Sequence, residues 1–124
     1  EQLKALCPAD FVLLSGDDAT CCDFILQGGK GVISVTANVA PRAMHEMCVA
    51  AMSGNVAEAV AINQKLLGLH RALFCEANPI PVKWALAQMG RIADGIRLPL
   101  TPLSSSNQER VRAALTRAGI AVGA

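Results

Sequence analysis

The sequence contains no tyrosine, and its aromatic residues are three phenylalanines and one tryptophan. With a net charge of +1 and basic residues scattered along the chain, it lacks the basic patches and the stacking platforms of a nucleic-acid-binding protein. Stretches without a charged residue reach only about a dozen positions, whereas a membrane-spanning helix needs about 20 apolar residues. We therefore expect no nucleic-acid partner and no membrane span.

The arrangement of the cysteines excludes two common uses of this residue. The five cysteines are an odd number and contain no CxxC pair, so the sequence has neither a disulfide framework nor a zinc knuckle. His45 and Cys48 are spaced as metal ligands on a helix can be, but Cys48 falls on the apolar side of its predicted helix, which favours core packing. We expect reduced thiols, no metal and no cofactor.

The sequence also lacks the features of a secretory signal. Its first ten residues, EQLKALCPAD, carry three charged side chains and no apolar core segment. A cytoplasmic location is therefore the default prediction. Because the chain begins at Glu1 and its mean hydropathy of +0.38 is high for a free-standing domain, we also expect it to be part of a larger protein.

What is present is a globular composition, with 52% apolar and 17% charged residues over 124 positions. Its most informative stretch is 31–41, GVISVTANVAP, in which the β-branched run Val32–Thr36 is apolar at nearly every position. Such a run predicts a parallel strand that is buried on both faces. The residues that follow, Thr36 to Asn38, would lie at the carboxyl edge, where α/β folds place their ligand sites.

A second strand is predicted before the central one, over Phe11–Ser15. Between the two strands, Asp17 and Asp18 can each cap a helix over about Ala19–Leu26, and Gly28-Gly29 end that helix. A strand, a helix and a strand in this order form a βαβ unit, so the two strands should be parallel.

The rest of the chain predicts helices only: one that begins at Pro41, a long one over about Val56–Phe74, a short one over Val82–Met89, and a last one opened by a capping box at Ser106 and Glu109. These helices cannot cover two parallel strands that are apolar on both faces, so the sheet must continue elsewhere. We predict an α/β fold in which residues 1–54 are the last two βα units of a (β/α)8 TIM barrel and residues 55–124 are a carboxyl-terminal helical domain.

Five segments carry a specific resemblance: LLSGDDA at 13–19, GGKGVISVTANVAPRAM at 28–44, INQKL at 62–66, NPIPVKWAL at 78–86 and RLPLTPLS at 97–104. In this order they resemble the carboxyl-terminal portion of the bacterial dihydrodipicolinate synthases, also called 4-hydroxy-tetrahydrodipicolinate synthases. The resemblance covers essentially the whole chain. The last two segments favour this family over N-acetylneuraminate lyase, which is similar in fold.

The resemblance implies a lyase that condenses pyruvate with aspartate semialdehyde in the first committed step of lysine and diaminopimelate biosynthesis. In the family, a lysine on the sixth barrel strand forms a Schiff base with pyruvate and a tyrosine relays protons. Neither residue can be assigned here, because the chain corresponds to the part after that strand. The resemblance also implies a homotetramer, a dimer of dimers, whose weaker contact involves the helix that contains Gln27. We expect the 124-residue chain alone to be inactive.

The resemblance assigns two substrate-binding residues in this chain and no catalytic residue. Gly16 matches a family glycine whose backbone lines the pyruvate site, and Ile33 matches an isoleucine that borders the bound keto acid. Asp17 and Asp18 are near enough in sequence to meet the second substrate, but helix capping explains them as well.

Other residues with reactive side chains have simpler interpretations. A Schiff-base lysine must be desolvated at a barrel interior, whereas Lys30, Lys65 and Lys83 are not on predicted strands and are interpreted as surface residues. His45 and His70 have no carboxylate at a catalytic spacing and are interpreted as surface or core histidines. Two alternatives stay open: another pyruvate-dependent aldolase of the same superfamily, and a non-catalytic helical interaction module.

Overall fold

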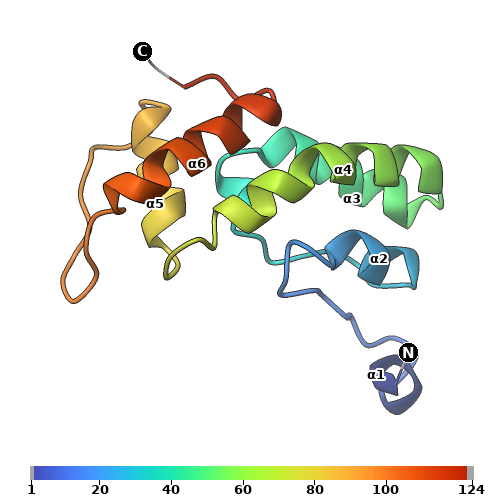
Figure 1. Ribbon diagram of the computed structural model, residues 1–124. Helices are drawn as coiled ribbons and strands as arrows, with labels where there is room; N and C mark the ends of the chain where they lie inside the picture. The colour runs from blue at the N-terminus through green and yellow to red at the C-terminus, as the bar shows by residue number, and fades with distance from the viewer. Residues whose placement is uncertain (1, 123–124) are drawn as a thin grey trace.

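The computed structural model describes residues 2–122. Its α-helices are α1 Gln2–Leu6, α2 Cys21–Leu26, α3 Pro41–Met52, α4 Val56–Ala72, α5 Ile80–Gln88 and α6 Ser105–Arg117, and a short 3-10 helix, η1, covers Thr36–Asn38. Helix α4 packs between α3 and α6, and α2 packs on α3 (Figure 1). Helix α1 lies beyond α2, away from α3 to α6 (Figure 1).

The two predicted strands do not form in the described residues, so the prediction of regular strands is wrong. The segments do pair, through a single parallel bridge between Ser15 and Val32. Its hydrogen bonds run from the Ser15 N–H to the Gly31 carbonyl and from the Ile33 N–H to the Ser15 carbonyl, both at 2.9 Å. The predicted parallel pairing is thus confirmed. One further hydrogen bond, from the Lys30 N–H to the Leu13 carbonyl at 2.8 Å, joins the segments before the bridge. The pairing does not grow into regular strands because each segment has a partner on one side only, and two lone strands are at best marginally stable.

The carboxyl end of the central segment also differs from the prediction. Val35 has helical backbone angles and Thr36 begins η1, so the extended chain ends before Val35. The N–H groups of these two residues donate to the side chain of Asp18. A backbone donor that is bound to a carboxylate is not available to a strand partner, which explains the early end of the segment.

The helix starts follow the sequence where the signal is local. Helix α3 begins at Pro41 as predicted, and α5 begins two residues earlier than predicted, at Ile80. The predicted capping box of α6 is wrong. The helix begins after Ser104, whose N–H and hydroxyl donate to the carboxylate of Glu76, on the loop that follows α4. The side chain of Ser104 makes no capping hydrogen bond to the helix, and its contact with a residue as distant in sequence as Glu76 has no local signature.

The hydrophobic core lies between helices α2 to α6. The inner faces that helical spacing predicts in α3, α4 and α6 are confirmed by residues that are at most 7% exposed: Met44, Met47, Ala51, Ala59, Leu66, Leu69, Leu73, Val111, Ala114 and Leu115. In α2 the buried residues are Cys21, Cys22 and Ile25. Helices α3 and α4 pack directly on each other. The predicted domain division after residue 54 therefore falls in a turn between two packed helices, and it stays a prediction. Within residues 2–122, none of the helices is both long and apolar enough to cross a membrane.

Candidate functional site

Gly16 and Ile33 come together at one end of the paired segments. They directly follow the bridged residues Ser15 and Val32, and the Ile33 N–H is bound to the Ser15 carbonyl. Both residues are exposed, with Ile33 at 72%. A side-chain carbon placed on Gly16 would meet no atom within 4 Å. This end of the bridge is therefore an open apolar surface, and the role of the two residues in binding stays a prediction.

The turn after Ser15 is held by short-range hydrogen bonds. The Asp17 N–H donates to the Ser15 hydroxyl at 3.1 Å. The carboxylate of Asp17 accepts from the N–H of Thr20 at 2.9 Å and from its hydroxyl at 2.6 Å. Thr20 is the residue before α2, so Asp17 holds the turn that leads into the helix, and a cap on the free N–H groups of the helix itself stays a prediction.

Asp18 has a different role from its neighbour, and the capping interpretation is wrong for it. Its side chain is 2% exposed, and its Oδ2 accepts from the N–H of Val35 at 3.0 Å and of Thr36 at 2.9 Å. The carboxylate therefore joins the turn after the first segment to the end of the second. Nothing in the local sequence indicates this contact, because the partners are 17 and 18 residues away.

Thr36 extends this connection to helix α4. Its hydroxyl shares a 2.8 Å hydrogen bond with Nδ1 of His70, which is 2% exposed. Burial lowers the pKa of His70, and the charges of Asp18 and Asp17 oppose this effect. The interpretation of His70 as a core histidine is confirmed. We call Asp18, Thr36 and His70 the Asp18–Thr36–His70 cluster.

The side chains around this cluster offer no activated nucleophile. Burial raises the pKa of Cys21 to about 12, so its thiol stays protonated and unreactive. Lys30 and Lys65 are exposed, as predicted, whereas Lys83 on α5 is half-buried and is not the solvated lysine that the sequence suggested. In the part of the chain that the structure describes, no three His, Cys, Asp or Glu side chains gather as a metal site would require.

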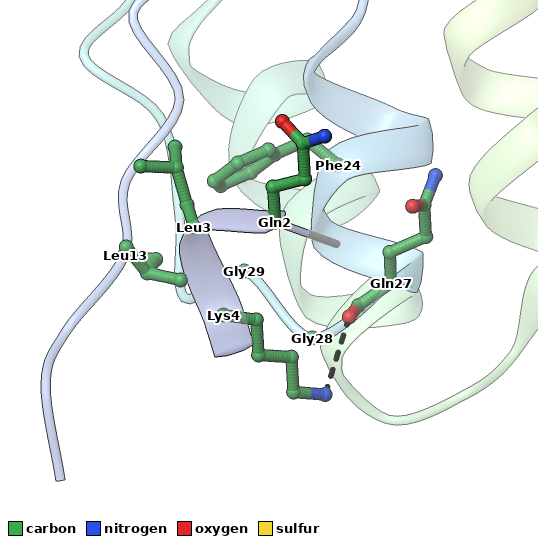
Figure 2. Close-up of a pocket in the computed structure, with 8 residues that line it drawn as sticks. All are labelled: Gln2, Leu3, Lys4, Leu13, Phe24, Gln27, Gly28 and Gly29. Carbon is green, nitrogen blue, oxygen red and sulfur yellow. Dashed lines mark hydrogen bonds between the residues drawn. The ribbon is translucent and has the colours of Figure 1, made fainter. Parts of the chain in front are cut away.

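A groove of about 600 Å³ lies at the other end of the paired segments. Figure 2 shows it between α1 and α2, with the side chains of Leu3, Leu13 and Phe24 on its walls and the Lys4 ammonium donating to the Gln27 carbonyl at 3.4 Å. The groove borders Gly28 and Gly29, which lead into the second segment, whereas Gly16 and Ile33 follow the bridge. Its lining is mainly apolar, and the Lys4 amine on it is exposed and bound to the Gln27 carbonyl.

Comparison with known proteins identifies the family. The sequence profile of the dihydrodipicolinate synthetase family matches residues 1–118. The 4-hydroxy-tetrahydrodipicolinate synthase of Aromatoleum aromaticum is 66% identical over 115 residues, which are 93% of this chain and 39% of that protein. That of Methylococcus capsulatus is 62% identical over 119 residues, 96% of this chain and 41% of that protein. This chain thus spans about 40% of the length of these relatives.

A solved structure agrees in fold with this assignment. The chloride-inhibited dihydrodipicolinate synthase of Acinetobacter baumannii, in complex with pyruvate, matches 97% of this chain with a TM-score of 0.93 and 49% identity, over 41% of its own length. The resemblance that the five sequence segments indicated is therefore confirmed. On the strength of a profile match over residues 1–118, the chain belongs to the dihydrodipicolinate synthetase family.

Proposed function

We propose that this chain is the carboxyl-terminal portion of a 4-hydroxy-tetrahydrodipicolinate synthase, the last two βα units of its (β/α)8 barrel with the helical domain. The intact enzyme condenses pyruvate with aspartate semialdehyde through a lysine Schiff base, the first committed step of lysine and diaminopimelate biosynthesis. The observation that carries the proposal is the parallel pairing of Ser15 with Val32, which leaves Gly16 and Ile33 adjacent and exposed at the carboxyl ends of both segments. This is the edge at which barrels hold their substrates.

In this proposal, the chain supplies part of the pocket wall and none of the reacting groups. The open space over Gly16 allows a substrate to approach the backbone closely. The exposed Ile33 side chain offers an apolar surface to the methyl group of a keto acid and excludes water from it. The Schiff-base lysine and the proton-relaying tyrosine come from outside this chain, which contains no tyrosine.

The proposal includes the assembly and the location of the enzyme. We expect a homotetramer, a dimer of dimers, in which α2, with Gln27 directly after it, belongs to the weaker contact. The side of α2 that bears Asp23 and Gln27 is exposed, as a contact surface between subunits must be in a single chain. A cytoplasmic location stays a prediction from the sequence.

The test is to trap the intermediate in the full-length protein that carries this chain. Incubation with pyruvate and reduction with borohydride should add one pyruvyl group to a lysine outside the present sequence, and the isolated 124-residue chain should gain none. A stoichiometric adduct on Lys30, Lys65 or Lys83 would overturn the proposal. Trapping of pyruvate without turnover of aspartate semialdehyde would instead favour another aldolase of the superfamily.

A pair of matched variants tests the wall itself. Ile33→Ser should raise KM for pyruvate because the apolar contact is lost. Val49→Ser, at an exposed valine on the outer side of α3, should leave KM unchanged. Equal KM values for pyruvate in both variants would show that Ile33 does not line the pocket.

A further inference from the structure

The Asp18–Thr36–His70 cluster is the most extended polar connection near the candidate site, and the proposed pocket wall does not use it directly. It joins three parts of the chain: the turn after the first segment, the start of η1, and helix α4. Asp18 and His70 are each 2% exposed, and Thr36 is fully buried. The cluster therefore cannot meet a substrate itself, and any effect on the site must pass through the backbone that it holds.

That backbone carries both residues of the proposed wall. Ile33 lies between two attachment points: its own N–H is bound to the Ser15 carbonyl, and Asp18 holds the N–H groups of Val35 and Thr36. Gly16 lies between Ser15 and Asp18 in sequence. The same two attachments thus set the separation of Gly16 from Ile33, in a region where no further strand pairing does so among the described residues.

If the cluster served only to pack the core, apolar side chains would stabilise the fold more. Within residues 2–122, Oδ1 of Asp18 and Nε2 of His70 are buried without a hydrogen bond to another protein atom, a property that Oδ1 of Asn63 shares. Buried polar atoms without partners destabilise a fold, and apolar side chains of similar shape would fill the same space at lower cost. Departures from the rule that buried polar atoms are hydrogen-bonded are expected mainly at functional sites.

We propose that Asp18, Thr36 and His70 are positioning residues for the keto-acid site: they hold Ile33 opposite Gly16 and connect that wall to α4. This inference rests on the proposed function and deepens it. Asp18 fixes the backbone through two charge-assisted hydrogen bonds, and His70 fixes the orientation of Thr36. The helical part of the chain thereby contributes to the geometry of a pocket that it does not line.

The test uses the full-length protein and compares Thr36→Val with Thr36→Ser. Valine keeps the shape of threonine and removes the hydroxyl, so the bond to His70 is lost, while serine keeps it. We expect Thr36→Val to lower kcat/KM for pyruvate, per folded molecule, by about tenfold or more, because small displacements of positioned groups have effects of this size. Thr36→Ser should recover most of the loss. A purely structural role would lower the folded fraction and leave KM unchanged.

Two further pairs guard against variants that do not fold. Asp18→Asn keeps the shape of the side chain but removes its charge, and Asp94→Asn, at an exposed position of the loop between α5 and α6, is its control. His70→Asn is compared with His45→Asn at an exposed position of α3. In Asp18→Asn and His70→Asn, but not in the controls, KM for pyruvate should rise and the amides of Val35 and Thr36 should exchange hydrogen faster.

The outcomes separate this inference from the function on which it rests. A wild-type protein that forms no borohydride-trapped adduct with pyruvate overturns the proposed function, and the inference with it. A wild-type protein that reacts, with Thr36→Val, Asp18→Asn and His70→Asn variants whose KM and kcat per folded molecule equal its own, overturns the inference alone.

Discussion

The amino-terminal third of the chain differs from helices α3 to α6 in the exposure of its large apolar side chains. In the first region, Phe11 and Val12, which belong to the first predicted strand, are 59% and 61% exposed. In the second, Leu69 and Leu115 are fully buried. A helix satisfies its backbone hydrogen bonds internally and needs one packed face, whereas a strand needs neighbours on both edges and cover on both faces.

The candidate site lies where these two regions meet. Ile33 belongs to the open region, and His70, which supports its segment through Thr36, belongs to the packed one. This difference indicates that packing against the helices is enough to fix the short stretch of chain around the Ser15–Val32 bridge. It is not enough to form a whole strand. The predictions below test how sharply the two regions differ, in order of decreasing effect.

The largest effect is expected from removing a buried side chain of the packed region. Leu69→Ala leaves a cavity between α3, α4 and α6 and should lower the free energy of unfolding of the 124-residue chain by about 3 kcal/mol. Val12→Ala, which removes an exposed side chain, should change it by less than about 0.5 kcal/mol. Urea unfolding in dilute solution measures both. Similar losses in the two variants would mean that the regions are equally packed.

The second prediction concerns self-association. The exposed apolar side chains of the amino-terminal region and the unpaired edges of its two segments should make the isolated chain associate at micromolar concentration. The double variant Phe11→Ser/Ile33→Ser should reduce the associated fraction, as measured by sedimentation velocity. Val49→Ser/Val56→Ser, at exposed positions of α3 and α4, is the control. A larger reduction in this control would place the contact on the helices instead.

The smallest effect is a pH dependence that His70 should produce. Because burial lowers its pKa in the folded chain, the unfolded chain binds the proton more readily between that lowered pKa and the ordinary value of about 6.5. The contribution of His70 to stability is therefore complete above about pH 6.5 and is lost as the pH falls from there to the folded pKa.

Urea unfolding between about pH 8 and pH 5 measures this dependence. His70→Asn should flatten the decline, and His45→Asn, at an exposed histidine, should not. An unchanged slope in His70→Asn would show that the imidazole does not titrate differently in the two states.

The helical part of the fold was predictable because its signals are local. The 3–4 spacing of leucines and alanines in α4 and the position of Pro41 at the start of α3 are properties of a few consecutive residues. The hydrogen bond of Ser104 ahead of α6 was not predictable, since its acceptor, Glu76, is on another loop. The same holds for Asp18, which binds residues of a distant segment, whereas its neighbour Asp17 binds Thr20 only three residues away, although the two are identical in type.

Taken by itself, the sequence determined the helices, the parallel pairing of the two segments, the family, and the choice of Gly16 and Ile33 as candidates for the site. Tertiary structure alone decided that the segments stop at one bridge, because strand length depends on partners that a single segment cannot encode. It also decided that Asp18 and His70 act from opposite sides of Thr36, 18 and 34 residues away from it. Side chains this far apart in sequence come into contact only when the chain packs, and no local sequence pattern predicts the contact.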